Sequence, residues 1–132
     1  MKSNDGLAFI HAGEMEWETV DKGIQRKILG YDDQLMMVHI RFEKGAVGSL
    51  HNHVHRQVSF VESGSFEITI DGKKKVLKQG DCFFVAPDLV HGVEALEEGG
   101  LIDVFAPARE DFLRLEEGRE YRTDESRIER DR

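Results

Sequence analysis

The chain has 132 residues, of which 39% are hydrophobic and 33% are charged, and its net charge is −8. This length predicts one domain built around one hydrophobic core. The negative charge argues against nucleic acid and against an anionic membrane as partners, and no apolar run reaches the ~20 residues that a membrane-spanning helix needs.

Compartment and redox state are indicated by two features of the sequence. Residues 1–6 lack the apolar segment of a secretory signal, which favours a cytoplasmic location. Cys82 is the only cysteine, so an intramolecular disulfide is excluded. It begins the apolar stretch 82–85, and we expect it to be a small buried packing residue.

From residue 35 onward, short apolar stretches alternate with turn signals. Residues 65–70 alternate apolar and polar side chains, and Asp71-Gly72 directly after them is a strong hairpin signal. Many short strands separated by glycine-containing turns predict an all-β sandwich or barrel. The predicted strands are 35–42, 57–61, 65–70, 75–77, 82–86, 93–96 and 101–105, with turns at 44–45, 62–64, 71–72, 79–81 and 98–100.

The C-terminal residues differ from the rest, because residues 109–132 contain nine acidic and seven basic residues and few apolar ones. Residues 110–115 are predicted to form a short helix, and the rest a frayed, mixed-charge tail, for which an interaction segment is the alternative. The predicted organisation is an N-terminal arm with the first strands (1–34), a β-barrel (35–108), and a short helix with a charged tail (109–132).

A cluster of potential metal ligands lies in the segment His51-Asn52-His53-Val54-His55-Arg56-Gln57. On an extended strand, residues two apart point to the same side, so His51, His53 and Gln57 can face one ion. His55 has the same parity, and geometry alone does not exclude it. Isolated His-x-His patterns are more often ordinary surface or core histidines, so the assignment needs further support.

His91, which follows a predicted buried strand, is the candidate ligand from elsewhere in the fold. Neutral imidazole nitrogens and one amide oxygen suit a single borderline divalent transition metal such as Ni, Zn, Fe, Mn or Co. For Gln57, the alternative to direct ligation is a hydrogen bond to one of the ligands.

The spacing of these residues resembles the two sequence motifs of the cupin superfamily. The first (45–64) reads Gly45, five residues, His51, one, His53, three, Gln57, six, Gly64, and the second (80–91) reads Gly80, six residues, Pro87, three, His91. The resemblance covers residues 35–108 and implies a double-stranded β-helix, or jelly-roll barrel. It implies that His51, His53, Gln57 and His91 hold the metal.

Two positions depart from the general cupin pattern. Gln57 stands where a glutamate ligand is common, and Ala95 stands where the second motif often has asparagine. Four neutral ligands leave more positive charge on the ion, which makes it a stronger Lewis acid and a better partner for an anionic substrate.

A further stretch, Asp103-Val104-Phe105-Ala106-Pro107-Ala108-Arg109-Glu110-Asp111-Phe112, together with residues 51–57 and 91–96, is similar to the pectin-degradation cupins of the KdgF type. The likeness spans residues 28–113. It implies an enzyme that opens the ring of 4,5-unsaturated monouronates, left by pectin or alginate lyases, to give linear 4-deoxy-5-keto uronates. It also implies Asp103, Phe105 and Arg109 as catalytic-pocket residues.

The residues themselves are compatible with this role. Leu101, Asp103 and Phe105 share one face of the last predicted strand, and an aspartate there is costly unless it is paired or used. Asp103 is therefore expected to transfer protons, with a salt bridge at the rim as the alternative. Arg109 is expected to bind the substrate carboxylate, with an exposed salt bridge to a neighbouring acid as the alternative, and Phe105 to pack on the sugar or in the core.

Other side chains are expected to lie outside the reaction. His39 and Arg41 are predicted at the surface or an interface, and His55 beside the pocket without binding metal. Trp17 is expected to pack the N-terminal arm onto the barrel or onto a partner subunit. Exposed strand edges favour a homodimer.

Two other functions are compatible with these residues. A cupin dioxygenase that uses iron or manganese has a similar histidine-rich site with open positions for oxygen and substrate. A non-catalytic cupin that binds a sugar or another small molecule needs the metal only for structure.

Overall fold

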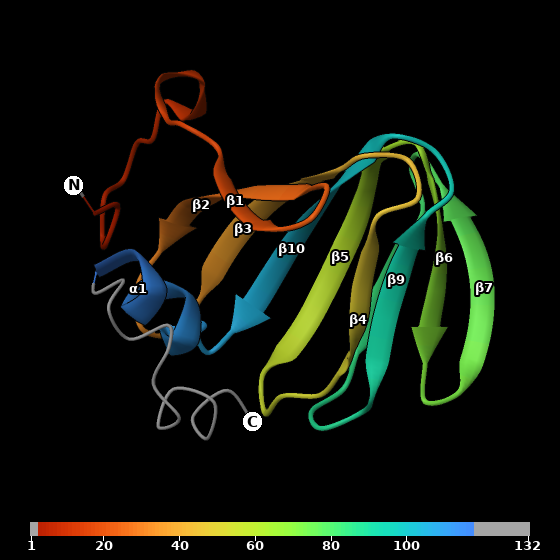
Figure 1. The fold of residues 1–132 in the computed structure, drawn as a ribbon. Coiled ribbons are helices and arrows are strands. Elements are labelled where there is room, and N and C mark those ends of the chain that lie inside the picture. Colours follow the sequence, from red (N-terminus) through yellow and green to blue (C-terminus); the bar gives the residue numbers. More distant parts are fainter. Residues whose placement is uncertain (1–2, 118–132) are drawn as a thin grey trace.

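Residues 3–117 are described in the computed structural model of the chain (Figure 1). The described residues form two antiparallel sheets, which face each other, and one α-helix at the end of the barrel. The elements are η1 (Ala12–Glu14), β1 (Glu18–Asp21), β2 (Ile24–Tyr31), β3 (Met36–Phe42), β4 (Val47–His51), β5 (Arg56–Ser63), β6 (Ser65–Ile70), β7 (Lys73–Lys78), β8 (Cys82–Val85), β9 (His91–Ala95), β10 (Gly99–Ala106) and α1 (Glu110–Glu117).

The strand order confirms the predicted jelly roll. One sheet has the order β1-β2-β3-β10-β5-β8 and the other the order β4-β9-β6-β7. Strands far apart in the chain are therefore neighbours: β10 lies between β3 and β5, and β9 lies between β4 and β6. These crossings bring residues from both sequence motifs to the same interior.

The core lies between the two sheets, and β5 and β6 alternate buried and less buried side chains as strands of an antiparallel sandwich do. Phe66 and Val61 are fully buried, and Phe66 makes an edge-to-face contact with Phe42 at 5.1 Å between ring centroids. The buried residues that pack together here are called the apolar core: Ile24, Phe42, Val61, Phe66, Ile68, Phe83, Val85, Ala95 and Leu101.

A second apolar cluster closes the barrel under α1. It contains Ile28, Met36, Val38, Phe105 and Ala108, and Phe112 and Leu113 of the helix pack against it. Glu110 and Asp111 occupy the first turn, where the helix dipole favours negative charge. The predicted helix is thus confirmed, and none of the helical segments in the described part of the chain is long and apolar enough to cross a membrane. The predicted charged tail from residue 118 lies outside the described residues.

The predicted turn at residues 98–100 is wrong in part, because Gly99 and Gly100 begin β10. A Cβ atom on Gly99 would collide with the backbone oxygen of Ser63, and one on Gly100 would lie 2.5 Å from Glu62 Oε1. These glycines therefore allow β5 and β10 to approach closely, next to an irregularity in their register.

Cys82 is exposed, which corrects the prediction of a buried packing residue. It is the first residue of β8 and pairs with Phe60, and both side chains point to the outer face of the six-stranded sheet. The next residue, Phe83, carries the buried side chain that was expected one position earlier.

Candidate metal centre and adjoining cavity

Three histidines from two strands and a loop converge at one end of the barrel interior. His51 ends β4 and pairs directly with His91, the first residue of β9, while His53 lies in the loop after β4. One nitrogen of each ring lies within 4.8 Å of the others, a separation at which all three can hold a single metal ion. His53 and His91 are buried, and His51 is exposed at the mouth.

The convergence does not arise from one extended strand, as the sequence argument assumed. β4 ends at His51 and β5 begins at Arg56, so the intervening residues form a loop. This loop carries His53 inward, and it places His55 outside the group of three histidines. The ring of His55 instead contacts those of His53 and Phe105, with centroid distances of 5.3 and 6.5 Å.

The tautomers of the three histidines are set by backbone carbonyl groups. Each ring uses Nδ1 for a hydrogen bond with a carbonyl oxygen, so Nδ1 carries the proton and Nε2 keeps a free lone pair. Such neutral rings are ready to bind a metal through Nε2. The pairs are His51 with Ser49 (2.8 Å), His53 with His55 (3.1 Å) and His91 with Leu89 (2.9 Å).

Gln57 completes this group through a directed chain of hydrogen bonds. Its Nε2 donates to Ser59 Oγ at 2.9 Å, and Ser59 Oγ donates to Asp103 Oδ1 at 2.6 Å. The amide oxygen of Gln57 must therefore point the other way, and it lies 3.2 Å from His53 Nε2. Two acceptor atoms facing each other without a proton repel, and a cation between them would relieve this repulsion.

The electrostatic environment keeps the histidines neutral. Burial, followed by the positive charge of Arg109, lowers the pKa of His53 to about 3. Burial also lowers the pKa of His91, whose Nε2 is buried and has no hydrogen-bond partner among the described residues. An uncharged, unpartnered ligand atom in the interior is costly unless something binds to it, so the residues present fit a divalent metal ion.

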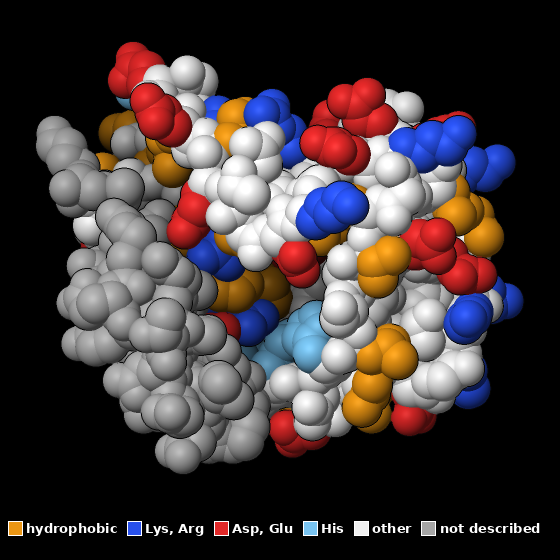
Figure 2. Space-filling view, viewed as in Figure 1, with side chains coloured by type: hydrophobic (Ala, Val, Ile, Leu, Met, Phe, Trp, Pro, Cys, Tyr) orange, Lys and Arg blue, Asp and Glu red, His pale blue; other side chains and the backbone are white. Residues whose placement is uncertain are grey.

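A cavity of about 250 Å³ adjoins the histidines. Figure 2 shows histidine, hydrophobic and basic side chains gathered in a recess of the molecular surface. Asp103, Phe105 and Arg109 line the cavity together with His51, His91 and Gln57. The cavity thus brings together all three predicted pocket residues and three of the four predicted ligands, and the fourth, His53, lies 3.2 Å from Gln57.

Asp103 is buried on the inner face of β10, as its parity predicted. Burial raises its pKa to about 6, although the hydrogen bond from Ser59 and the charge of Arg109 act in the opposite direction. A carboxyl group with this pKa can both accept and release a proton near neutral pH.

The alternative for Arg109, a salt bridge to a neighbouring acid, is present with Asp111, although Arg109 is buried and not exposed as that alternative had it. Its Nε and Nη2 donate to the two carboxylate oxygens of Asp111, at 3.0 and 2.6 Å. Burial raises the pKa of Asp111, but the hydrogen bonds from Arg109 outweigh it and hold that pKa below its usual range. The guanidinium also lies over the rings of Phe105 and Phe112, at 5.1 and 4.2 Å.

Comparison with known proteins identifies the family. The family model for the cupin domain matches residues 38–105. The chain belongs to the cupin family. The pectin degradation protein KdgF of Dickeya dadantii (strain 3937) is 49% identical over 102 residues, which cover 76% of this cupin and 93% of that protein.

Two solved structures are similar to this cupin along most of its length. An RmlC-like cupin from Shewanella frigidimarina has a TM-score of 0.80 and 44% identity, covering 83% of this chain and 99% of that one. KdgF from Halomonas sp. has a TM-score of 0.76 and 40% identity, covering 80% and 97%. The resemblance to KdgF-type cupins that the sequence indicated is therefore confirmed.

Two polar residues of this cupin's interior, Arg26 and Ser59, were missed by the sequence analysis. Both are buried, and both are in phase with buried apolar residues of their strands: Arg26 lies between Ile24 and Ile28, and Ser59 precedes Val61 by two. A polar residue at an inward-facing strand position is the pattern that could have identified both residues, but it was used only for Asp103.

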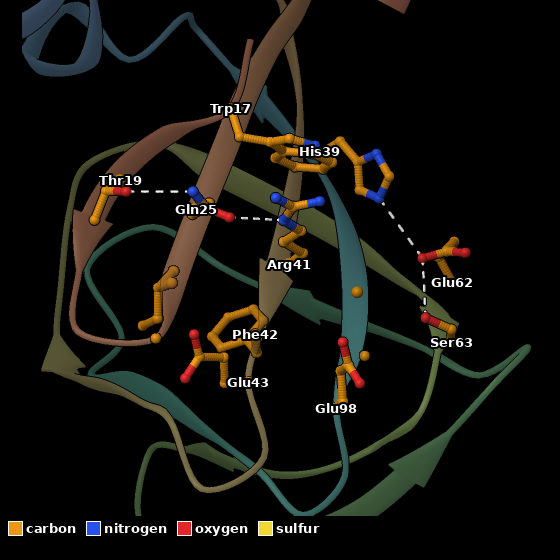
Figure 3. A pocket seen from close by; sticks show the side chains of 14 residues that line it. Trp17, Thr19, Gln25, His39, Arg41, Phe42, Glu43, Glu62, Ser63 and Glu98 are labelled. Atoms are coloured by element: carbon orange, nitrogen blue, oxygen red, sulfur yellow. Dashed lines mark hydrogen bonds and ion pairs between the residues drawn. The ribbon is translucent and has the colours of Figure 1, made fainter. Parts of the chain in front are cut away.

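The larger groove of this cupin, of about 730 Å³, lies elsewhere, over the outer face of the six-stranded sheet (Figure 3). The guanidinium of Arg41 lies over the Trp17 ring at 4.1 Å from its centroid, and Trp17 also contacts His39 edge-on. These contacts confirm that the N-terminal arm packs on the barrel and that His39 and Arg41 face outward. Arg41 Nε donates to Gln25, and His39 Nε2 lies 3.6 Å from Glu62 Oε1. The metal-binding candidates are absent from this groove.

Proposed function

We propose that this chain is a metal-dependent enzyme that opens the ring of 4,5-unsaturated monouronates from pectin or alginate breakdown, giving linear 4-deoxy-5-keto uronates. The observation that carries the proposal is the chain of hydrogen bonds from Asp103 through Ser59 to Gln57, which joins a proton-transfer group to the metal-binding candidates in one cavity. The 49% identity to a pectin degradation protein supports the choice of substrate.

His51, His53, His91 and Gln57 would hold one divalent ion, and Ni, Zn, Fe, Mn and Co all suit this set. Lewis-acid stabilisation of a substrate oxygen that becomes negative is the chemistry that such an ion supplies when bound. The neutral ligand set supports that role, because no carboxylate ligand reduces the charge of the ion.

Asp103 would move the proton. The reaction begins when its carboxylate accepts the proton of the anomeric hydroxyl, the C1–O bond to the ring oxygen breaks, and an enolate remains at C5. Delivery of the same proton to C4 then gives the ketone, so the net change is an isomerisation. The pKa of about 6 supports both roles for Asp103.

Phe105 and Arg109 would position the sugar. Phe105 presents an apolar ring to the cavity beside Asp103. Arg109 contributes positive charge next to the site, while Asp111 accepts hydrogen bonds from its Nε and Nη2 and holds the guanidinium in place.

The test is turnover of a lyase-generated unsaturated monouronate by metal-replete protein, followed by loss of the ultraviolet absorbance of its alkene. We expect acceleration over the spontaneous rate, and we expect a chelator to remove it. A rate equal to the spontaneous one would reject this function. Uptake of oxygen by an iron- or manganese-loaded protein would instead support a dioxygenase.

We also infer a homodimer, from an apolar patch on the outer face of the six-stranded sheet. An antiparallel sheet with one solvated face normally carries polar residues there, whereas this face exposes large apolar ones. Neighbouring strands align Met37 with Val104, Val58 and Phe84, and Ile102 with Phe60. Phe60→Glu should convert a dimer to a monomer in light scattering, and a monomeric parent protein would reject the inference.

A cytoplasmic location is the remaining inference. The single cysteine, Cys82, is a free and exposed thiol, which fits a reducing compartment better than an oxidising one. Cell fractionation with an antibody to the protein tests this, and recovery outside the cytoplasm would reject it.

A further inference from the structure

Arg26 is a buried cation on the inner face of β2, where its neighbours in phase are Ile24 and Ile28. Its side chain retains about 5% exposure and lines the same cavity as His51, His91 and Asp103. Arginine is almost never buried to this extent unless its charge is paired or used. The contacts of each nitrogen therefore indicate what the residue is for.

The contacts of Arg26 satisfy one part of the guanidinium and leave another open. Nε donates to Glu18 Oε1 at 3.1 Å, and the guanidinium carbon lies 4.0 Å from the centroid of the Phe112 ring. Nη2 is buried and has no hydrogen-bond partner among the described residues. A buried charged donor without an acceptor destabilises the protein, and an acceptor that enters the cavity removes this penalty.

Arg109 provides an internal comparison, because its guanidinium lies over the same Phe112 ring at 4.2 Å. Its Nε and Nη2 are both held by Asp111, whereas Arg26 keeps Nη2 free. Two guanidinium groups thus pack on the ring of Phe112 beside one cavity. They differ in how many of their nitrogens donate to a carboxylate, one in Arg26 and two in Arg109. Arg26 is the better placed of the two to make a new charge-assisted hydrogen bond.

We propose that Arg26 is the residue that binds the carboxylate of the substrate, through Nη2. The inference rests on the proposed function, and it names a substrate-binding residue outside the Asp103–Arg109 segment. Each arginine of the cavity has one carboxylate partner, Glu18 or Asp111, and Nη2 of Arg26 is the buried donor left for a ligand, which matches a single negative charge. A sugar monocarboxylate has that charge and also hydroxyl groups for the metal side of the cavity.

The experiment compares the parent protein with Arg26→Gln, using metal-replete protein throughout. Glutamine removes the charge but can still donate to Glu18, which is partly exposed and stays solvated. We expect the KM for the unsaturated monouronate to rise roughly tenfold to hundredfold, kcat to fall less, and the metal content to stay the same. Arg26→Lys should recover part of the loss. The matched control is Arg41→Gln on the outer face of β3, which should leave both constants unchanged.

A binding measurement separates this inference from the proposed reaction. Galacturonate and galactose, which cannot undergo the reaction, are titrated into metal-replete protein. The parent should bind galacturonate more tightly, and Arg26→Gln should bind the two sugars alike. Absence of turnover by the parent rejects the proposed reaction but leaves this comparison intact. An equal affinity of the parent for the two sugars, or an unchanged preference in Arg26→Gln, would overturn the role of Arg26.

The parent protein also allows a test without substitution, should Arg26→Gln fail to fold. The side-chain nitrogen resonances of Arg26 are followed by NMR during the same titrations, with zinc as the metal. We expect them to shift with galacturonate and not with galactose. Resonances that remain still while galacturonate saturates the protein would overturn the proposal.

Discussion

The barrel interior has two halves that are built from the same strands. At one end, Val61 of β5 belongs to the apolar core; at the other end of the same strand, Gln57 faces the cavity beside Asp103 of β10. The apolar half is satisfied by packing alone. The polar half is satisfied by hydrogen bonds, with the exception of a few buried nitrogens.

These exceptions are the informative atoms. Buried polar groups are nearly always paired, so each unpaired one needs an explanation. Two of the unpaired nitrogens, His91 Nε2 and Arg26 Nη2, belong to residues that line one cavity. The apolar half therefore accounts for stability, and the unpaired atoms of the polar half support the two proposed ligands, a metal on the histidine side and an anion on the arginine side. Substitutions in the two halves should have separable effects.

The largest expected effect comes from His91→Ala in the polar half. We expect loss of stoichiometric metal and of turnover, because two imidazoles and an amide would remain as ligands. The measurements are metal content after gel filtration and loss of alkene absorbance. His55→Ala is the control, since His55 lies outside the cluster, and it should keep one metal per chain. Full metal content in His91→Ala would break the assignment of the polar half.

In the apolar half, Phe66→Ala should lower the free energy of unfolding by about 3–5 kcal/mol. Phe66 is fully buried against Phe42, and its removal leaves a cavity. Urea denaturation measures this change. Folded Phe66→Ala protein should still bind its metal, because no metal-ligand candidate belongs to the apolar core. Loss of metal from protein that remains folded would show that the two halves are not separable.

The raised pKa of Asp103 predicts that the free energy of unfolding depends on pH. Folding raises this pKa from 3.8 to about 6, so the folded chain binds the proton more tightly than the unfolded chain. This carboxyl therefore stabilises the fold below about pH 4, and this contribution is lost as the pH rises through about 6. The free energy of unfolding falls by at most about 3 kcal/mol over this range.

Urea denaturation of metal-free protein at several pH values measures this effect. The pKa of His53 acts in the opposite direction, so the parent is compared with Asp103→Asn, in which only the carboxyl is removed. Asp103→Asn should gain stability relative to the parent as the pH rises from 4 to 7. A constant difference between the two proteins would contradict the raised pKa.

A smaller effect is expected for Ser59→Ala, which interrupts the hydrogen bonds between Asp103 and Gln57. The carboxamide of Gln57 would lose its fixed orientation, and metal affinity should fall roughly 10- to 100-fold. Competition with a chromogenic chelator measures it. Ser63→Ala is the control, because Ser63 ends the same strand and its hydroxyl donates to the exposed side chain of Glu62. Equal affinities in the two variants would remove Ser59 from the metal site.

The sequence predicted the parts of this molecule whose signals are local. The alternation in residues 65–70 corresponds to β6 without any shift in its bounds, and the motif spacing correctly selected the three histidines that come together. The inward position of Asp103 followed from strand parity. Each of these signals depends only on residues near one another in the chain or on a spacing that the family shares.

The missed parts depend on contacts between distant segments. β4 was not predicted because most of its residues are exposed and it has no apolar alternation. The side chain of Arg26 contacts Glu18 and Phe112, which lie far apart in the sequence. The role of Ser59 depends on its hydrogen bond to Asp103 on the neighbouring strand. No pattern within a single segment contains these relations.

We propose that one carboxyl group, that of Asp103, moves the proton in this cavity and is linked to the metal-binding candidates through Ser59. The most direct measurement is the turnover of an unsaturated monouronate by Asp103→Asn, with the metal content determined on the same sample. We predict one metal per chain and a rate reduced about 10²- to 10⁴-fold. Parent-like turnover by the metal-replete variant would contradict the account.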